Sequence, residues 1–194
     1  MKPVTRGEIL GLAEYEKVRE QFRSRVIEEK RARRVLVGDR VSAIFENHDT
    51  VLLQIQELLR TERITRDGAI QHEIDTYNQS IPGDGALSAT VMIEIPDKDA
   101  REAFLTAARG FEKHVALLVD GERISATWEK SRELETRASA VNYLRFPLSK
   151  RALAHVLEKK KDARIEVLVD HPEYAARAKL SPATAASLAE DLAE

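Results

Sequence analysis

This chain of 194 residues, 43% of them hydrophobic, is long enough to bury one complete core. Its 31 basic and 33 acidic residues leave a formal net charge of −2, whereas nucleic-acid-binding domains usually carry a basic excess, so we expect no nucleic-acid partner. The absence of cysteine excludes disulfides, thiolate nucleophiles and cysteine-ligated zinc or iron–sulfur centres.

The start of the sequence, MKPVTRGEIL, lacks the apolar run of a signal peptide. Elsewhere, no segment approaches the roughly 18 apolar residues that a membrane-spanning helix needs. We therefore expect a soluble, cytoplasmic protein that does not associate with membranes.

The first part of the chain has the apolar spacing of helices. Thr5 and Glu8 have the spacing of a capping box, which predicts that a helix begins there. Apolar residues three or four positions apart extend this helix over about 6–33. Its predicted buried stripe is Leu12, Tyr15, Val18, Phe22 and Val26. The other elements predicted in this part are strands over 35–37 and 41–46, joined at Gly38-Asp39, and helices over about 49–62 and 66–79.

The segment QSIPGDGALS interrupts the helical pattern, and short β-branched runs follow it. Asp120-Gly121 is a strong hairpin signal between two apolar runs. The other elements predicted in this part are strands over 87–95, 139–146 and 164–170, helices over 97–110 and from Ser149, a turn at HPEY, and a terminal helix from Ser181-Pro182.

The order strand, helix, strand occurs twice in the second half, as in a split βαβ or ferredoxin-like sheet with helices on one face. We predict an α+β fold in which an N-terminal helical half packs on a C-terminal, mostly antiparallel sheet. A single domain over 1–194 is expected, with an internal subdivision into a mainly helical part, 1–82, and an α+β part, 83–194.

Two acidic residues interrupt the apolar stripes of the predicted helices. On a helical wheel of about 100° per residue, Glu62 falls at the centre of the apolar face of the helix over 49–62, whereas Glu57 falls on the solvated face. Glu73 lies within the stripe of the next helix. A buried carboxylate is costly unless it is paired, hydrogen-bonded or metal-bound, so both acids are candidate site residues.

These acids have two interpretations. In the functional one, Glu62 and Glu73 converge with His48 or His72 on a divalent metal ion or an acid–base site. In the structural one, each carboxylate pairs with an arginine, or the helix ends before Glu62 and leaves it in water. No Glu-x-x-His sequence occurs, so a di-iron carboxylate bundle is not indicated.

The remaining motifs give one more candidate residue and argue against two kinds of functional site. His171 precedes Pro172 at the end of a predicted strand, a loop position of the kind that often carries site residues. PGDGALS lacks the Gly-Lys-Ser/Thr ending of a phosphate-binding loop. No Gly-x-Ser-x-Gly sequence is present for serine nucleophile chemistry.

Four segments, FENHDTVLLQIQELLRTERI, EIDTYN, LSATVMIEI and DHPEY, resemble a bacterial family catalogued as domain of unknown function 3501. The resemblance extends over nearly the whole chain and implies no known activity. Family members are often encoded beside rubrerythrin-like and iron–sulfur proteins, which implies a link to oxidative stress or redox metabolism. The matching positions are Glu46, Asn47, Thr50, Gln54, Glu57, Arg60, Glu62, Glu73, Tyr77, Asn78, His171 and Tyr174.

Two functional hypotheses follow. The first is a cytoplasmic binding or accessory protein, either a homodimer or the partner of a redox protein, because the long first helix can present a face to another chain. The second is a metal-dependent or carboxylate-based enzyme centred on Glu62 and Glu73. Arg60, Tyr77, Asn78 and His171 are further candidate residues in either case.

Overall fold

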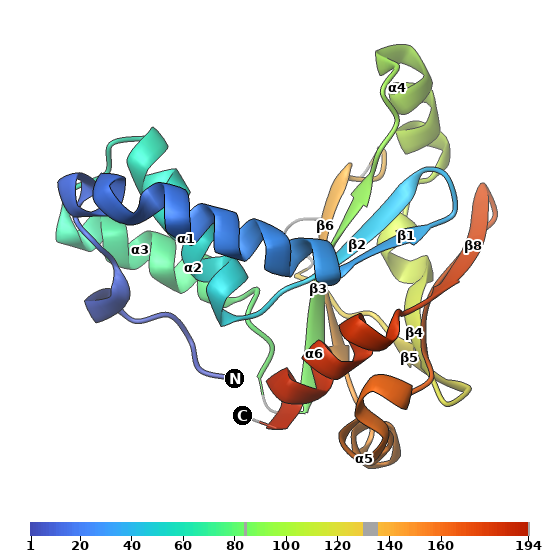
Figure 1. Cartoon of the computed structure of the whole chain (residues 1–194). Coiled ribbons are helices and arrows are strands. Elements are labelled where there is room, and N and C mark those ends of the chain that lie inside the picture. The colour runs from blue at the N-terminus through green and yellow to red at the C-terminus, as the bar shows by residue number, and fades with distance from the viewer. Residues whose placement is uncertain (84, 130–135, 194) are drawn as a thin grey trace.

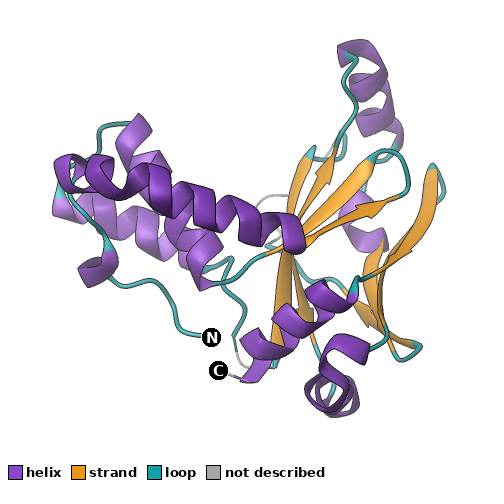
Figure 2. Ribbon diagram, in the orientation of Figure 1, coloured by secondary structure: helices purple, strands orange, loops and turns teal. Residues whose placement is uncertain are grey.

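The computed structural model describes residues 1–83, 85–129 and 136–193, and within these ranges it contains six α-helices and two four-stranded antiparallel sheets. Three helices project from one end of the sheets, and the other three lie against the sheets (Figures 1 and 2). The predicted α+β class, with a helical N-terminal half and a mostly antiparallel C-terminal half, is confirmed. In the described ranges, no helix has the length and apolar character needed to cross a membrane.

The projecting helices are α1 (Leu12–Ala32), α2 (His48–Thr61) and α3 (Asp67–Asn78). The predicted helix over 6–33 is two elements, a 3-10 turn η1 (Arg6–Glu8) and α1. Gly11 separates them because its backbone is extended, with φ −62° and ψ 156°. The capping-box residues therefore start the short turn, where the Glu8 carboxylate accepts from the Thr5 backbone N–H at 2.8 Å.

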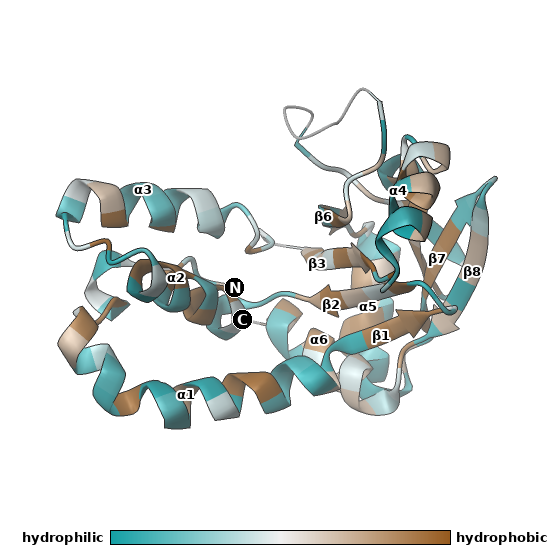
Figure 3. Cartoon of the chain, turned by 90° about the horizontal axis from the view of Figure 1, so that it is seen from above, coloured by the Kyte–Doolittle hydropathy of each residue, from teal (hydrophilic) through white to brown (hydrophobic). Residues whose placement is uncertain are grey.

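Apolar side chains of α2 and α3 form the core of the helical part. Val51, Ile55 and Leu59 of α2 are buried against Ile70 and Ile74 of α3, as their spacing predicts. The stripe predicted along α1 is only partly present. Tyr15 and Val26 are buried, but Val18 is exposed. Most of α1 is hydrophilic, in contrast to β1 and β2 (Figure 3).

The first sheet has the strand order β1-β2-β3-β6 and the second β5-β4-β7-β8. The hairpins predicted at Gly38-Asp39 and Asp120-Gly121 are both present as antiparallel pairs. The strands are β1 (Arg34–Val37), β2 (Val41–Phe45), β3 (Ala86–Ile93), β4 (Val115–Val119), β5 (Glu122–Ser125), β6 (Val141–Pro147), β7 (Ile165–His171) and β8 (Tyr174–Lys179).

One large core joins the two sheets. The remaining helices, α4 (Lys98–Ala107), α5 (Lys150–Lys159) and α6 (Pro182–Ala193), contribute side chains to this core. Each of α4 and α5 connects a strand of the first sheet to a strand of the second, so the predicted βαβ order is present across two sheets and not within one. β1 and β2, which belong to residues 1–82, pair in the same sheet as β3 and β6 of the second half.

β8 was not predicted from the sequence. Its residues, YAARAK, alternate between half-buried and exposed positions, but three of the six are alanine, which is depleted in strands. The predicted turn HPEY connects β7 to this strand. The Tyr174 hydroxyl, at the start of β8, donates to the Val37 carbonyl at 2.6 Å and accepts from the Arg40 N–H at 3.2 Å. β8 therefore ties the β1–β2 turn to the second sheet.

A buried arginine joins the helical part to the sheets. Arg33, directly after α1, has no exposed surface. Its guanidinium donates to the carbonyls of Phe45 and Glu46, at 2.8 and 3.3 Å, where the chain leaves β2 for α2. It also donates to Ser187 and forms an ion pair with Asp191, both on α6. One side chain therefore connects α1, the β2–α2 connection and the C-terminal helix.

We expect Arg33→Met to lower the free energy of unfolding by about 3–5 kcal/mol, because it removes the buried guanidinium that donates to the Asp191 carboxylate and to two carbonyls. Urea denaturation followed by circular dichroism measures this. Arg31→Met is the matched control, since Arg31 pairs with Glu28 on the exposed surface of α1, and should change stability by less than about 0.5 kcal/mol. Equal effects of the two changes would contradict the role of Arg33.

We expect Gly38→Ala to destabilise the protein by about 2 kcal/mol or more. Gly38 has φ +73°, and a Cβ there would lie 2.2 Å from the Tyr174 hydroxyl oxygen. Gly68→Ala is the control, because nothing lies within 4 Å of its Cβ position and alanine favours the helix that contains it. Thermal unfolding should show a lower midpoint for Gly38→Ala only. Partial recovery in Gly38→Ala combined with Tyr174→Phe would identify the hydroxyl as the clash.

Candidate functional site

Glu62 does not lie on a buried helix face. Helix α2 ends at Thr61, and Glu62 is its exposed C-cap residue, as in the structural interpretation in which the helix ends first. Glu73 is half-buried on α3, and His72 beside it is exposed. Within the described ranges, no three or more His, Asp or Glu side chains are grouped so that they could hold a metal ion. The metal site at these residues stays a prediction without a converging set of ligands.

His48 lies at the start of α2 and contacts the N-terminal segment. Its Nδ1 is 3.0 Å from the Lys2 carbonyl oxygen, and its Nε2 is 2.9 Å from a Glu8 carboxylate oxygen. Neither contact brings it toward Glu62 or Glu73. Through these two contacts, His48 holds the segment before α1 against the start of α2.

Three further candidates have structural contacts. Arg60 donates to Glu16 at 2.5 Å and so links α2 to α1. The Asn78 side chain accepts from the Val4 N–H at 2.9 Å and donates to the Val4 carbonyl at 2.8 Å. Tyr77 packs, half-buried, against the apolar core of the helices. All three hold the N-terminal region and the helices together.

His171 is buried at the end of β7. Its Nδ1 accepts from the Glu173 N–H at 3.1 Å, so its Nε2 carries the proton and donates to the Arg109 carbonyl at 3.3 Å. The ring also stacks edge-on against His114, with centroids 4.8 Å apart. Both ring nitrogens therefore bond to backbone groups. These bonds account for the burial of His171 as part of the structure of the β7–β8 turn, without a role in a site.

Glu57 was predicted to lie on a solvated face and is instead half-buried between α2 and α1. Arg19 donates to both of its carboxylate oxygens, at 2.8 and 2.7 Å, and the Tyr15 hydroxyl donates at 2.7 Å. The Arg19 bond lowers the pKa of Glu57 below its ordinary value. Burial, together with the Glu57 bond, raises the pKa of Tyr15 far above its ordinary value. The prediction was wrong because α1 packs on the polar side of α2.

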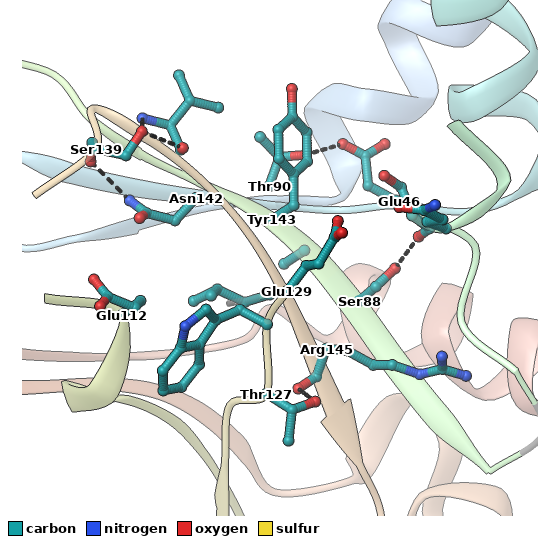
Figure 4. Close-up of a pocket in the computed structure, with 16 residues that line it drawn as sticks. Glu46, Ser88, Thr90, Glu112, Thr127, Glu129, Ser139, Asn142, Tyr143 and Arg145 are labelled. Carbon is teal, nitrogen blue, oxygen red and sulfur yellow. Dashed lines mark hydrogen bonds between the residues drawn. The ribbon is translucent and has the colours of Figure 1, made fainter. Parts of the chain in front are cut away.

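A pocket of about 550 Å³ lies around β6, where the first sheet meets the connections to the helices. Residues from β3, β6, the α3–β3 connection and the segment after β5 surround it (Figure 4). Its described lining residues are Glu46, Gln79, Ser80, Ser88, Ala89, Thr90, Glu112, Thr127, Trp128, Glu129, Ser139, Val141, Asn142, Tyr143, Leu144 and Arg145.

Glu46 is the buried acid of this pocket. Only 3% of its surface is exposed. One carboxylate oxygen accepts from the Thr50 hydroxyl and the other from the Thr90 hydroxyl, both at 2.5 Å. Its backbone N–H donates to the Ser88 carbonyl at 3.0 Å. The side chain is thus fixed in position by two neutral donors, one from α2 and one from β3.

Other polar residues continue the wall of the pocket on both sides of β6. The Ser88 hydroxyl donates to the Ser80 carbonyl at 2.5 Å, and the Asn142 amide donates to the Ser139 carbonyl at 2.9 Å. Glu46 and Ser88 lie on one side of β6, whereas Glu112 and Asn142 lie on the other (Figure 4). The pocket therefore curves around this strand.

Of the pocket residues, the sequence reasoning had singled out only Glu46, through the family resemblance. Ser88 and Thr90 carried a signal, since they alternate with apolar residues in the strand LSATVMI. Glu112 had none, because it lies in the short 3-10 turn η2 (Phe111–His114) before β4. Tyr143 and Trp128 likewise carry no local pattern that distinguishes a pocket aromatic from a core aromatic.

The model of the family described as "Protein of unknown function (DUF3501)" matches residues 3–192. The chain belongs to the DUF3501 family. It is similar to the crystal structure of a "novel protein of unknown function" from Burkholderia pseudomallei, with 36% sequence identity and a TM-score of 0.91. That likeness covers 98% of this chain and 100% of the other. No curated protein matches this DUF3501 chain.

We expect the Glu57 contacts to make the stability of this DUF3501 protein depend on pH. Because the folded-state pKa of Glu57 is lowered, its stabilisation is complete above the ordinary carboxyl pKa of 4.5 and is lost as the pH falls through the folded value. Glu57→Gln should cost about 1.5–3 kcal/mol at pH 7 and much less near pH 3.

Urea denaturation at pH 3, 5 and 7 measures this difference. The control is Glu62→Gln, which removes an exposed acid at the end of the same helix. A Glu57→Gln penalty that is the same at all three pH values would show that the lost charge is not responsible.

Proposed function

We propose that this DUF3501 protein binds a small organic molecule in the pocket around β6 and acts as a binding or accessory protein. The observation that carries the proposal is Glu46, a buried carboxylate that two hydroxyls hold rigidly at the pocket wall. Small-molecule sites are typically concave, have volumes of roughly 300–1,000 Å³ and combine apolar walls with a few fixed polar groups. The volume of about 550 Å³ lies in this range.

The lining supports this proposal. Apolar and aromatic surface comes from Val141, Leu144, Trp128 and Tyr143. Hydrogen-bonding groups come from the Glu46 carboxylate and the Asn142 amide, and bonds within the protein fix the positions of both. Preorganised polar groups lower the entropic cost of binding. A ligand would meet a site that is already formed.

The family context leads us to propose in addition that the bound molecule belongs to oxidative-stress or redox metabolism in the cytoplasm. The chain would act there as an accessory protein, as a homodimer or beside a redox protein. We propose that the long helix α1, on which Val18 is exposed, provides the surface for a second chain. Size-exclusion chromatography with light scattering, together with affinity capture of an iron–sulfur or rubrerythrin-like protein, tests this part.

Trp128 offers a direct test of binding, because it is the only tryptophan of the chain and it lines the pocket. We expect a chemically mixed fragment library, with neutral, anionic and cationic members, to include compounds that change Trp128 fluorescence in a saturable way at millimolar concentration or below. Displacement of water from the indole surroundings provides the signal.

The controls locate the binding. Trp128→Phe should abolish the fluorescence change, and Leu144→Trp should weaken binding of the same compounds by filling the pocket. Leu10→Trp, at an exposed position between η1 and α1 that does not line the pocket, should leave binding unchanged. A library without any saturable ligand would overturn the proposed function.

A further inference from the structure

We infer that the ligand of this pocket is an organic cation, an amine or an amidinium attached to an apolar body, and that Glu46 is its counter-ion. This inference rests on the proposed function and specifies its ligand class. It is carried by two nearly buried carboxylates that have no cationic partner among the described residues.

Glu46 has acceptor capacity that the protein does not use. An ionised carboxylate can accept roughly four hydrogen bonds, and Glu46 accepts from two hydroxyls. Arg33 contacts Glu46 only through the backbone carbonyl and forms its ion pair with Asp191. A buried charge without a paired opposite charge is unfavourable, so a cation in the pocket would gain a desolvated partner that is already in place.

Glu112 is a second, independent observation. It is only 9% exposed, it lines the same pocket, and its carboxylate forms no hydrogen bond or ion pair with a described residue. Burying a carboxylate without a partner lowers the stability of the fold, unless a bound molecule supplies the missing hydrogen bonds or opposite charge. It lies across β6 from Glu46, so the two carboxylates flank the strand from opposite sides (Figure 4).

The balance of charge in the lining is negative. Glu46, Glu112 and Glu129 carry three carboxylates, and Arg145 carries the single guanidinium among the described lining residues. The Arg145 guanidinium lies against Gly83, where its Nη2 would be 2.5 Å from a Cβ, and the side chain extends away from Glu112 (Figure 4). A concave surface of one sign concentrates ligands of the opposite sign.

The rest of the pocket favours an organic cation over a metal ion. Divalent ions such as Ca²⁺ bind about six or more oxygen ligands at short distance, but the described residues contain no group of three or more metal-ligating side chains. The Thr50 and Thr90 hydroxyls direct their protons at Glu46. Trp128 and Tyr143 provide aromatic faces, which attract ammonium and guanidinium groups and pack against apolar bodies.

The experiment compares probes of one shape and different charge: benzylamine, benzamidine, benzyl alcohol and benzoate, titrated into the full chain by calorimetry and Trp128 fluorescence at pH 7.5. We expect the two cations to bind at least about tenfold more tightly than the alcohol, and benzoate to show no saturable binding. Glu46→Gln should weaken benzylamine binding by about thirtyfold or more, the loss expected when one partner of a buried charge pair is removed.

Glu62→Gln is the matched control and should leave benzylamine binding unchanged, because Glu62 is exposed at the end of α2. Glu112→Gln should weaken the binding of both cations and leave that of benzyl alcohol unchanged. If circular dichroism shows that Glu46→Gln does not fold, the order of affinity of the four probes for the unsubstituted chain tests the cation inference by itself.

The outcomes separate the two proposals. Equal binding of all four probes, preference for benzoate, or unchanged benzylamine binding in folded Glu46→Gln would overturn the cation inference and leave the proposed function standing. Tighter binding of Mn²⁺ or Mg²⁺ than of either organic cation, lost in Glu46→Gln, would also overturn it in favour of a metal. If neither these probes nor the mixed library binds, the proposed function fails and the inference fails with it.

Discussion

The buried guanidinium of Arg33 is the interaction on which the arrangement of this fold depends. Removing a charge from water costs several kcal/mol, and a buried ion pair repays that cost only when every donor and acceptor is satisfied. Arg33 meets this condition through Asp191, Ser187 and two carbonyls. These partners come from two distant parts of the chain, α6 and the end of β2 with its connection to α2, so all the contacts form only when α1, the β2–α2 connection and α6 are in place.

That constraint also positions the pocket. Arg33 holds the carbonyl of Glu46, and the Ser88 carbonyl holds its N–H, so the backbone of the buried acid is fixed on both sides. The Ser88 hydroxyl in turn bonds the Ser80 carbonyl in the connection from α3 to β3. The pocket therefore lies where the chain crosses between the helices and the sheets. A ligand bound there would contact both parts and favour their observed arrangement.

Much of the fold could be predicted because it depends on local patterns. The apolar spacing of α2 and α3 and the two Gly-containing hairpins are present as predicted. The helices predicted from residues 97 and 149 also form, and the side chains of Asp97 and Ser149 cap them by accepting from backbone N–H groups. The failures have tertiary causes. β8 pairs despite its alanine-rich sequence because β7 offers an edge, and the start of α1 was misplaced because one glycine changed the direction of the chain.

The candidate site was harder to predict because its acids lie outside the regular elements. A helical wheel finds an acid only where a periodic face makes it conspicuous, and it therefore selected Glu62 and Glu73. Glu46 lies in the two-residue connection between β2 and α2, where periodicity gives no information. Its carboxylate accepts from the Thr90 hydroxyl of β3, a residue that only the folded chain brings close to it.

The position of Glu46 also explains how this acid can be buried with no cationic partner among the described residues. Glu46 immediately precedes Asn47, the N-cap of α2, whose side chain accepts from the Thr50 N–H. The first turn of a helix carries roughly half a unit of positive charge, which stabilises a nearby carboxylate by about 0.3–1 kcal/mol. This field and two hydroxyl bonds offset part of the cost of burial without an ion pair. The remaining acceptor sites of the carboxylate then stay available on the pocket side, where a bound cation would complete the compensation.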